Sequence, residues 1–77
     1  MLKIVLLDGA QITHEVLAQR FSFPSCYGRN LDALHDCLTD IAEETAIIVE
    51  HAADADPRIL RVLRDSVKEN PKLKIYG

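Results

Sequence analysis

The sequence has few of the residues that mark several common classes of protein. It contains only two cysteines, Cys26 and Cys37, with ten residues between them, no C-x-x-C spacing and no second pair to complete a zinc site. The apolar run near the N-terminus is broken at Asp8, and no stretch approaches the roughly 20 apolar residues of a membrane span. We therefore expect a soluble, cytoplasmic protein with free thiols and no disulfide framework.

Basic residues are missing from the middle of the chain. No lysine or arginine lies between Arg29 and Arg58. The net charge of −3 opposes direct binding to nucleic acid, which requires a basic patch, and suits a basic partner better. The same segment holds eight acidic residues, namely Asp32, Asp36, Asp40, Glu43, Glu44, Glu50, Asp54 and Asp56.

The length and the apolar pattern predict one small α/β domain that comprises residues 1–77. A second core would leave both cores too small to bury enough surface. Short apolar runs at 2–7, 46–49 and 73–76 are typical of strands, and the first run predicts a strand buried on both faces. Helical periodicity lies between these runs. The order strand, helix, helix, strand, helix, strand predicts a parallel sheet with right-handed crossovers.

Three helix starts are marked by capping residues. Thr13 is expected to cap a helix that ends near Phe21, and Asn30 is expected to cap the second. Asp56 followed by proline predicts the start of the third helix, which should stop before Pro71. In the second helix, a buried stripe is predicted at Leu31, Leu34, Leu38 and Ile41.

The second predicted helix also carries a row of like charges. Asp32, Asp36 and Asp40 are four residues apart, a spacing at which like charges destabilise an isolated helix by roughly 0.2–0.5 kcal/mol per pair. The helix dipole favours Asp32 near the N-terminus but not Asp36 or Asp40. Local stability therefore does not explain the row. It is either solvated surface or a set of carboxylates that binds a cationic cleft, where a fixed carboxylate can substitute for phosphate.

Two chemical uses of the same helix remain open. Asp32, His35 and Asp36 share one face and could converge on a metal ion, although no further ligand set accompanies them. Acid/base catalysis by the two aspartates lacks a nucleophile motif, a glycine-rich phosphate loop or a basic substrate clamp. We therefore expect no enzyme, no cofactor and no metal as the first hypothesis. An acidic module that binds another kind of basic protein is the main alternative.

The run FPSCYGRNLDALHDCLTD, residues 23–40, resembles the signature of the barstar family of intracellular ribonuclease inhibitors. The resemblance continues through LLDGAQI, IIVEH and ILRVLRD, so it spans most of the chain. It implies a three-stranded parallel sheet packed with three or four helices. The matching positions in the signature are Tyr27, Gly28, Asn30, Leu31, Asp32, Ala33, Leu34, Asp36, Cys37, Leu38 and Thr39.

The resemblance also implies a partner-binding surface on the second helix, the loop before it and a patch on the last helix. Asp36 matches the central aspartate that occupies a phosphate position in the ribonuclease active site. The expected partner is a toxin-type ribonuclease, bound 1:1 by a protein that is monomeric until then, with neither nucleic acid nor a membrane involved. The implied surface residues are Cys26, Gly28, Arg29, Asp32, His35, Asp36, Asp40, Val62 and Asp65.

Departures from the family pattern bear on the identity of the target. His35 stands where the family's namesake has tryptophan, and Cys26 stands where it has an aromatic residue. The chain is also shorter between Glu50 and Ile59, which predicts a loop in place of a small helix. For Asp65, pairing with Arg61 or Lys68 is an alternative to partner binding. Cys37 and Tyr27 are expected to pack in the core.

Overall fold

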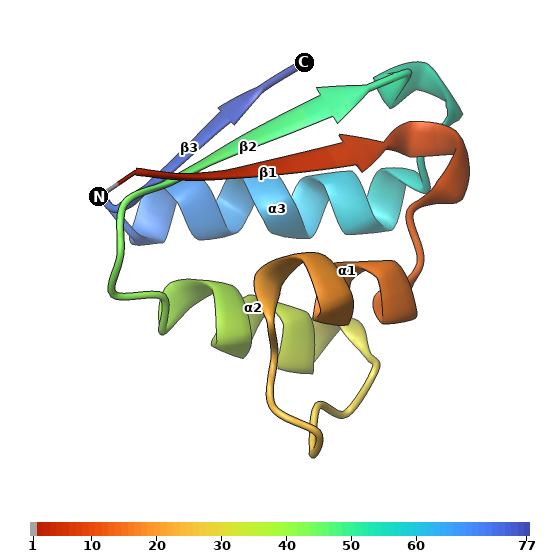
Figure 1. Ribbon diagram of the computed structural model, residues 1–77. Helices are drawn as coiled ribbons and strands as arrows, with labels where there is room; N and C mark the ends of the chain where they lie inside the picture. Colours follow the sequence, from red (N-terminus) through yellow and green to blue (C-terminus); the bar gives the residue numbers. More distant parts are fainter. Residues whose placement is uncertain (1) are drawn as a thin grey trace.

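The protein is built on a three-stranded parallel sheet, seen in a computed structural model that describes residues 2–77 (Figure 1). Its strands are β1 (Lys3–Asp8), β2 (Thr45–Glu50) and β3 (Leu73–Tyr76), in the order β1-β2-β3. Lys3 is paired with Thr45, which is in turn paired with Leu73. The predicted parallel α/β fold is confirmed.

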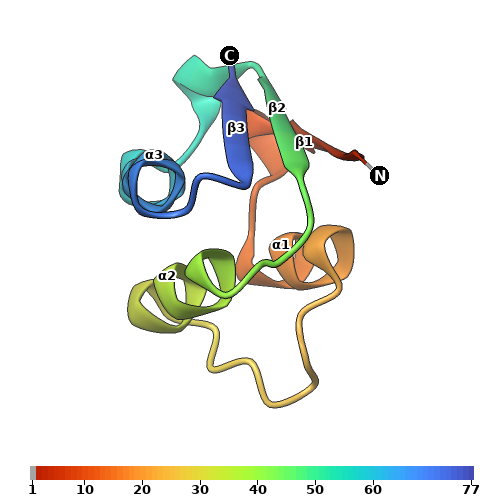
Figure 2. The ribbon, with the colours of Figure 1, turned by 90° about the vertical axis from the view of Figure 1, so that its left-hand side faces the viewer.

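Three helices lie on one side of this sheet (Figures 1 and 2). They are α1 (His14–Phe21), α2 (Leu31–Thr39) and α3 (Pro57–Glu69). Two short 3₁₀ turns, η1 (Gly9–Gln11) and η2 (Ala52–Asp54), follow β1 and β2 and lead into α1 and α3. Between Glu50 and Ile59, where the sequence predicts a loop in place of a small helix, the only helical element is the three-residue turn η2. Along residues 2–77, no helix combines the length and the apolar character that crossing a bilayer requires.

Each helix begins at the predicted capping residue. The cap side chain accepts a hydrogen bond from a backbone N–H of the first turn, which would otherwise lack an intrahelical partner. Because these caps are local, sequence alone locates the helix starts. The three contacts are Val16 N–H to Thr13 Oγ1 at 3.1 Å, Ala33 N–H to Asn30 Oδ1 at 2.8 Å and Arg58 N–H to Asp56 Oδ1 at 2.9 Å.

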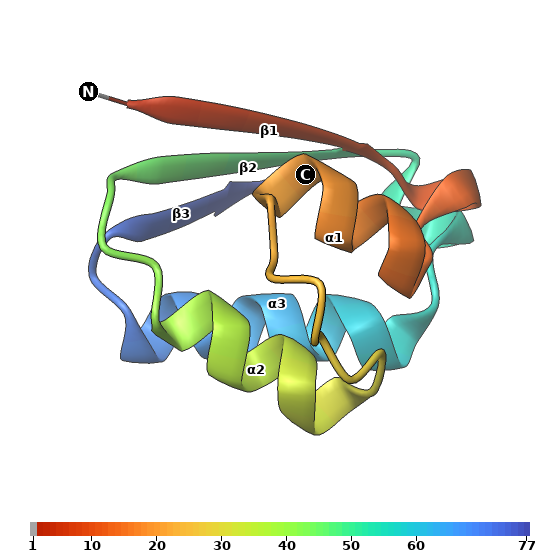
Figure 3. The ribbon, with the colours of Figure 1, turned by 60° about the horizontal axis from the view of Figure 1, so that its bottom comes forward.

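The core lies between the sheet and the helices. The α2 stripe is buried as predicted at Leu34 and Leu38, whereas Ile41 packs against the core from beyond the end of the helix. α3 lies against the sheet, and α2 packs on α3 at the side away from the strands (Figures 1 and 3). Buried members of this core include Val5, Leu7, Leu17, Ile47, Val49, Ile59, Leu60, Leu63 and Leu73.

The prediction that β1 is buried on both faces is wrong. Val5 and Leu7 are buried beneath the helices, but Ile4 and Leu6 point to the opposite face and are exposed. In residues 2–77 no helix lies over that face (Figures 1 and 2). A continuous apolar run is compatible with a strand buried on both faces, but burial of the outer face also requires a second layer of helices.

One buried amide fixes the end of α2 against the rest of the fold. The side-chain nitrogen of Asn70, the residue that follows α3, donates to the carbonyl oxygens of Leu38 at 3.0 Å and Ile41 at 2.9 Å, with a longer contact to Thr39 at 3.3 Å. Its oxygen accepts from the N–H of Lys72 at 3.0 Å. The last carbonyls of a helix lack intrahelical partners, so Asn70 satisfies groups that water reaches poorly.

Replacing Asn70 with alanine is expected to destabilise the fold by about 2–3 kcal/mol, because the buried or partly buried carbonyl groups of Leu38, Thr39 and Ile41 would lose the amide donor. Asn70→Asp should destabilise it at least as strongly, since a carboxylate would face those carbonyls. Urea unfolding followed by circular dichroism measures both. A loss within about 0.5 kcal/mol, as for an ordinary surface change, would contradict this role.

Candidate partner-binding site

The acidic row of α2 is exposed, and its carboxylates have no partner in the part of the chain that the structure describes. Asp32, Asp36 and Asp40 all face solvent. Their carboxylates make no hydrogen bond or ion pair with any residue in the range 2–77. Asp40 is the C-cap residue, in a position that the helix dipole disfavours. The row is therefore positioned by the helix without contributing a local stabilising contact.

The loop between α1 and α2, whose path is visible in Figure 3, is attached to the core through Tyr27 and its neighbour Phe23. Tyr27 is buried, as predicted, and its hydroxyl is 2.7 Å from Nδ1 of His14. Its ring also packs against that of Phe23, with the centroids 4.9 Å apart. Around this anchor, Cys26, Gly28 and Arg29 are exposed at the same end of α2 as Asp32.

The left-handed backbone conformation in the loop before α2 belongs to Arg29, with φ of 52°, and not to Gly28. A non-glycine residue there costs about 1–2 kcal/mol. At Gly28 the constraint is space, since a Cβ would lie 3.2 Å from Nδ2 of Asn30. Arg29 itself reaches Glu15 of α1 at 3.6 Å, an exposed pair of small energetic value.

The expected patch on α3 lies next to α2. Val62 is half-buried against the core, and Asp65 is exposed, with its Oδ2 3.9 Å from Nε of Arg61. The Asp65 carboxylate is therefore close to Arg61 but only weakly held. A hollow of about 290 Å³ lies between the exposed sides of α2 and α3 and is lined by His35, Asp65, Lys68 and Glu69.

Glu69 was missed by the sequence reasoning. Its carboxylate forms a hydrogen-bonded ion pair with Nε2 of His35, and this contact joins α3 to α2. The hydrogen bond to Glu69 raises the pKa of His35, and the nearby Asp36 and Asp65 carboxylates act in the same direction. The only signal in the sequence was the helical spacing that puts Glu69 one turn beyond Asp65. The pairing itself depends on tertiary packing.

Cys37 occupies the inner flank of α2, as predicted. Burial raises the pKa of its thiol, and the carboxylates of Asp40 and Asp36 raise it further. A thiol in this setting stays protonated and is a poor nucleophile. Both cysteines are free.

The metal hypothesis finds no support in the geometry. Across residues 2–77, no three histidine, cysteine or acidic side chains come close enough together to hold an ion. His35, the central ligand of that hypothesis, is engaged with Glu69 instead. The arrangement is suited to binding a cationic surface rather than to coordination.

Comparison with known proteins gives a consistent result. A family model described as "Barstar (barnase inhibitor)" matches residues 3–72. The chain is also similar to the "Putative ribonuclease inhibitor YrdF" of Bacillus subtilis (strain 168), with 45% identity over 40 residues. That match covers 46% of this chain and 44% of the relative, so it spans less than half of either protein.

The His35–Glu69 bridge predicts a pH-dependent contribution to stability. Because the pKa of His35 is higher in the folded than in the unfolded chain, the folded protein binds the proton more tightly. The stabilisation is thus complete below the unfolded pKa of about 6.5 and is lost as pH rises through the folded value.

Urea unfolding of the wild type and of Glu69→Gln between about pH 5.5 and pH 9 isolates this effect. The wild type should be the more stable at the acidic end, and the difference should shrink toward the alkaline end. A difference that stays constant or grows with pH would contradict the assignment.

Proposed function

The chain belongs to the barstar family, and on that basis we propose that it is an intracellular inhibitor, or immunity protein, of a toxin-type ribonuclease. It acts in the cytoplasm, performs no catalysis and binds one ribonuclease per chain. Support comes from the family match and from the acidic middle of the sequence.

One observation carries the proposal: three exposed carboxylates project from α2 without a partner among residues 2–77. Like charges four residues apart destabilise an isolated helix. The presence of this row is explained if its carboxylates meet positive charge in a complex. An active site that binds the RNA backbone presents lysine, arginine or histidine, and a carboxylate accepts charge-assisted hydrogen bonds from each of these.

In the proposed complex, Asp36 occupies the phosphate-binding position of the enzyme. Asp32 and the loop with Gly28 lie beside it, toward the start of α2. Inhibition requires only that this anion is pre-organised and that substrate is excluded, so the rigidity of α2 is itself functional. Asn70 and the Asn30 cap hold the two ends of the helix. The acidic middle of the chain accelerates encounter with a basic enzyme.

The contact surface differs chemically from that of the family's namesake. A polar bridge, His35–Glu69, occupies the place of an aromatic side chain, and the exposed Cys26 replaces another. We infer that the target enzyme has polar or charged groups opposite the hollow between α2 and α3, where Asp65 also lies. The cognate ribonuclease is therefore expected to differ from barnase.

Asp36→Ala should weaken inhibition by about a hundredfold or more, since two hydrogen bonds to charged groups are together worth about 3 kcal/mol. Asp40→Ala should have a much smaller effect because Asp40 lies at the far end of the helix. Titration of RNA cleavage by a ribonuclease captured from the host measures both, with barnase as the comparison enzyme.

Thermal unfolding of each variant serves as the folding control. Equal losses for Asp36→Ala and Asp40→Ala would contradict the role given to Asp36.

The salt dependence of association separates inhibition from general acidic binding. Raising ionic strength from about 0.05 M to about 0.5 M shortens the screening length from about 14 Å to about 4 Å, so association with the enzyme should slow markedly. If the protein is an inhibitor, the bound enzyme must also lose its ability to cleave RNA. A basic partner that binds with this salt dependence but retains its activity would instead support an acidic protein-binding module.

A further inference from the structure

The face of the sheet opposite the helices is unusually apolar. The large apolar side chains with high exposure among residues 2–77 all belong to it: Leu2 at 54%, Ile4 at 59%, Leu6 at 52% and Tyr76 at 57%. They share one face because side chains alternate along a strand. Parallel sheets are almost always covered on both faces. This face therefore resembles one side of a protein–protein interface.

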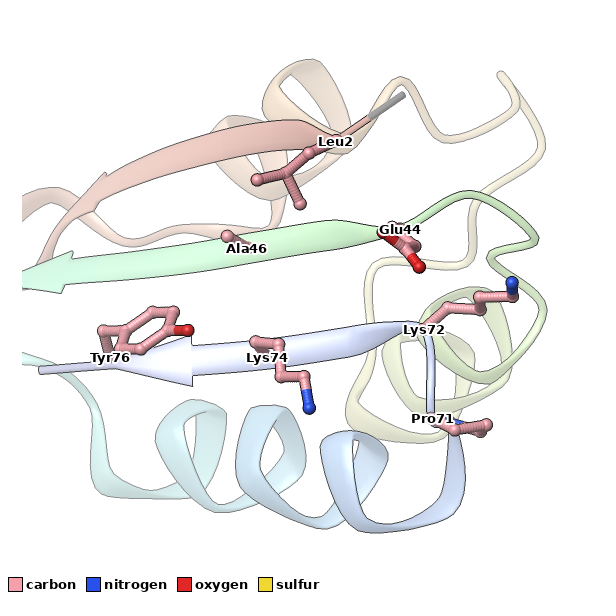
Figure 4. A pocket seen from close by; sticks show the side chains of 7 residues that line it. All are labelled: Leu2, Glu44, Ala46, Pro71, Lys72, Lys74 and Tyr76. Atoms are coloured by element: carbon pink, nitrogen blue, oxygen red, sulfur yellow. The ribbon is translucent and has the colours of Figure 1, made fainter.

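A hollow of about 250 Å³ lies on this face, and Figure 4 shows the residues that line it. Its apolar lining comes from Leu2, just before β1, Ala46 of β2 and Tyr76 of β3, and Lys72 and Lys74 border it where β3 begins. Glu44 and Pro71 complete the lining. The surface thus combines an apolar centre with a corner, at the beginning of β2 and β3, where two lysines outnumber one glutamate; this is the basic corner of the face.

The opposite corner of the face carries two carboxylates. Asp8 and Glu50 end β1 and β2 and are paired in the parallel ladder. The Asp8 carboxylate accepts from the N–H of Ala10 and lies 3.2 Å from Nδ1 of His51, whereas Glu50 is exposed and has no such partner among residues 2–77. Lys72 precedes β3, whose first residue is level with the first residue of β2. The acidic and basic corners therefore lie at the two ends of one diagonal. A twofold axis that lies between two such faces, parallel to them and along the other diagonal, makes the strands of the two sheets cross at about 90°, a known mode of sheet packing. It brings each basic corner over the partner's acidic corner.

We propose that this face binds a second copy of the chain, sheet against sheet, in a twofold dimer. Apolar side chains meet in the centre, and Lys74 of each copy lies against Glu50 of the other. Three strands of six residues at most span roughly 20 Å by 14 Å, or about 280 Å² of flat surface. This is well below the roughly 800 Å² per partner of a standard stable interface, so the dimer is weak and depends on concentration.

The proposed dimer leaves the α2 surface free. α2 lies on the far side of the molecule from the open face (Figures 1 and 2). Each copy could therefore still bind one ribonuclease, and the inference does not depend on the proposed inhibitory function. It replaces the expectation of a free monomer and keeps the expected ratio of one enzyme per chain.

Sedimentation equilibrium of the chain from about 10 μM to about 1 mM tests self-association. The average mass should rise toward that of a dimer in the wild type. Leu6→Lys should remain a monomer, because it places a charge at the apolar centre. Arg64→Glu, on the exposed side of α3, is the matched control and should associate like the wild type.

Charge reversal tests the geometry. Glu50→Lys and Lys74→Glu should each weaken self-association about tenfold or more, since each places like charges at two symmetry-related contacts. An equimolar mixture of the two variants should associate again, because every contact then joins opposite charges. Circular dichroism checks that each variant is folded.

Three outcomes would overturn the proposal. A wild type that stays monomeric at the highest concentration leaves the face to a different occupant, such as an amphipathic helix of another protein. Association that Leu6→Lys leaves intact places the dimer contact elsewhere. A mixture of the charge variants that fails to associate excludes the crossed arrangement.

Discussion

The position of α2 depends on the side-chain amide of Asn70. This group joins the carbonyl end of α2 to the turn between α3 and β3, so one buried residue connects the candidate binding helix, the longest helix and the sheet. The contacts are directional, unlike apolar packing. Leu34 and Leu38 fix how deeply α2 is buried, and Asn70 fixes where it ends.

That anchoring allows an unfavourable charge pattern to persist. Asp36 and Asp40 lower the intrinsic stability of α2, and within residues 2–77 neither gains a compensating ion pair. The buried side of the same helix offsets this cost. Local and global preferences conflict on the exposed side alone, which is the pattern expected where a surface is selected for binding rather than for stability.

Much of the fold could be predicted because its signals are local. Capping by Thr13, Asn30 and Asp56, the helical spacing of Leu34 and Leu38, and the end of α3 before Pro71 all depend on neighbours in sequence. The exposure of Ile4 and Leu6, the anchoring by Asn70 and the contact between His35 and Glu69 could not. Each depends on which distant segment lies opposite, and a single sequence does not encode that in its periodicity.

The register of the ladder has a consequence for synthesis. Lys3 pairs with Thr45, so β1 leaves the ribosome 45 − 3 = 42 residues ahead of its neighbour and has no strand to pair with in that interval. Non-local parallel pairing is slow to form, and unpaired apolar strands are prone to aggregate. Because no other element of the described chain covers Ile4 and Leu6 even after the ladder closes, this strand keeps apolar surface open to solvent throughout synthesis and folding.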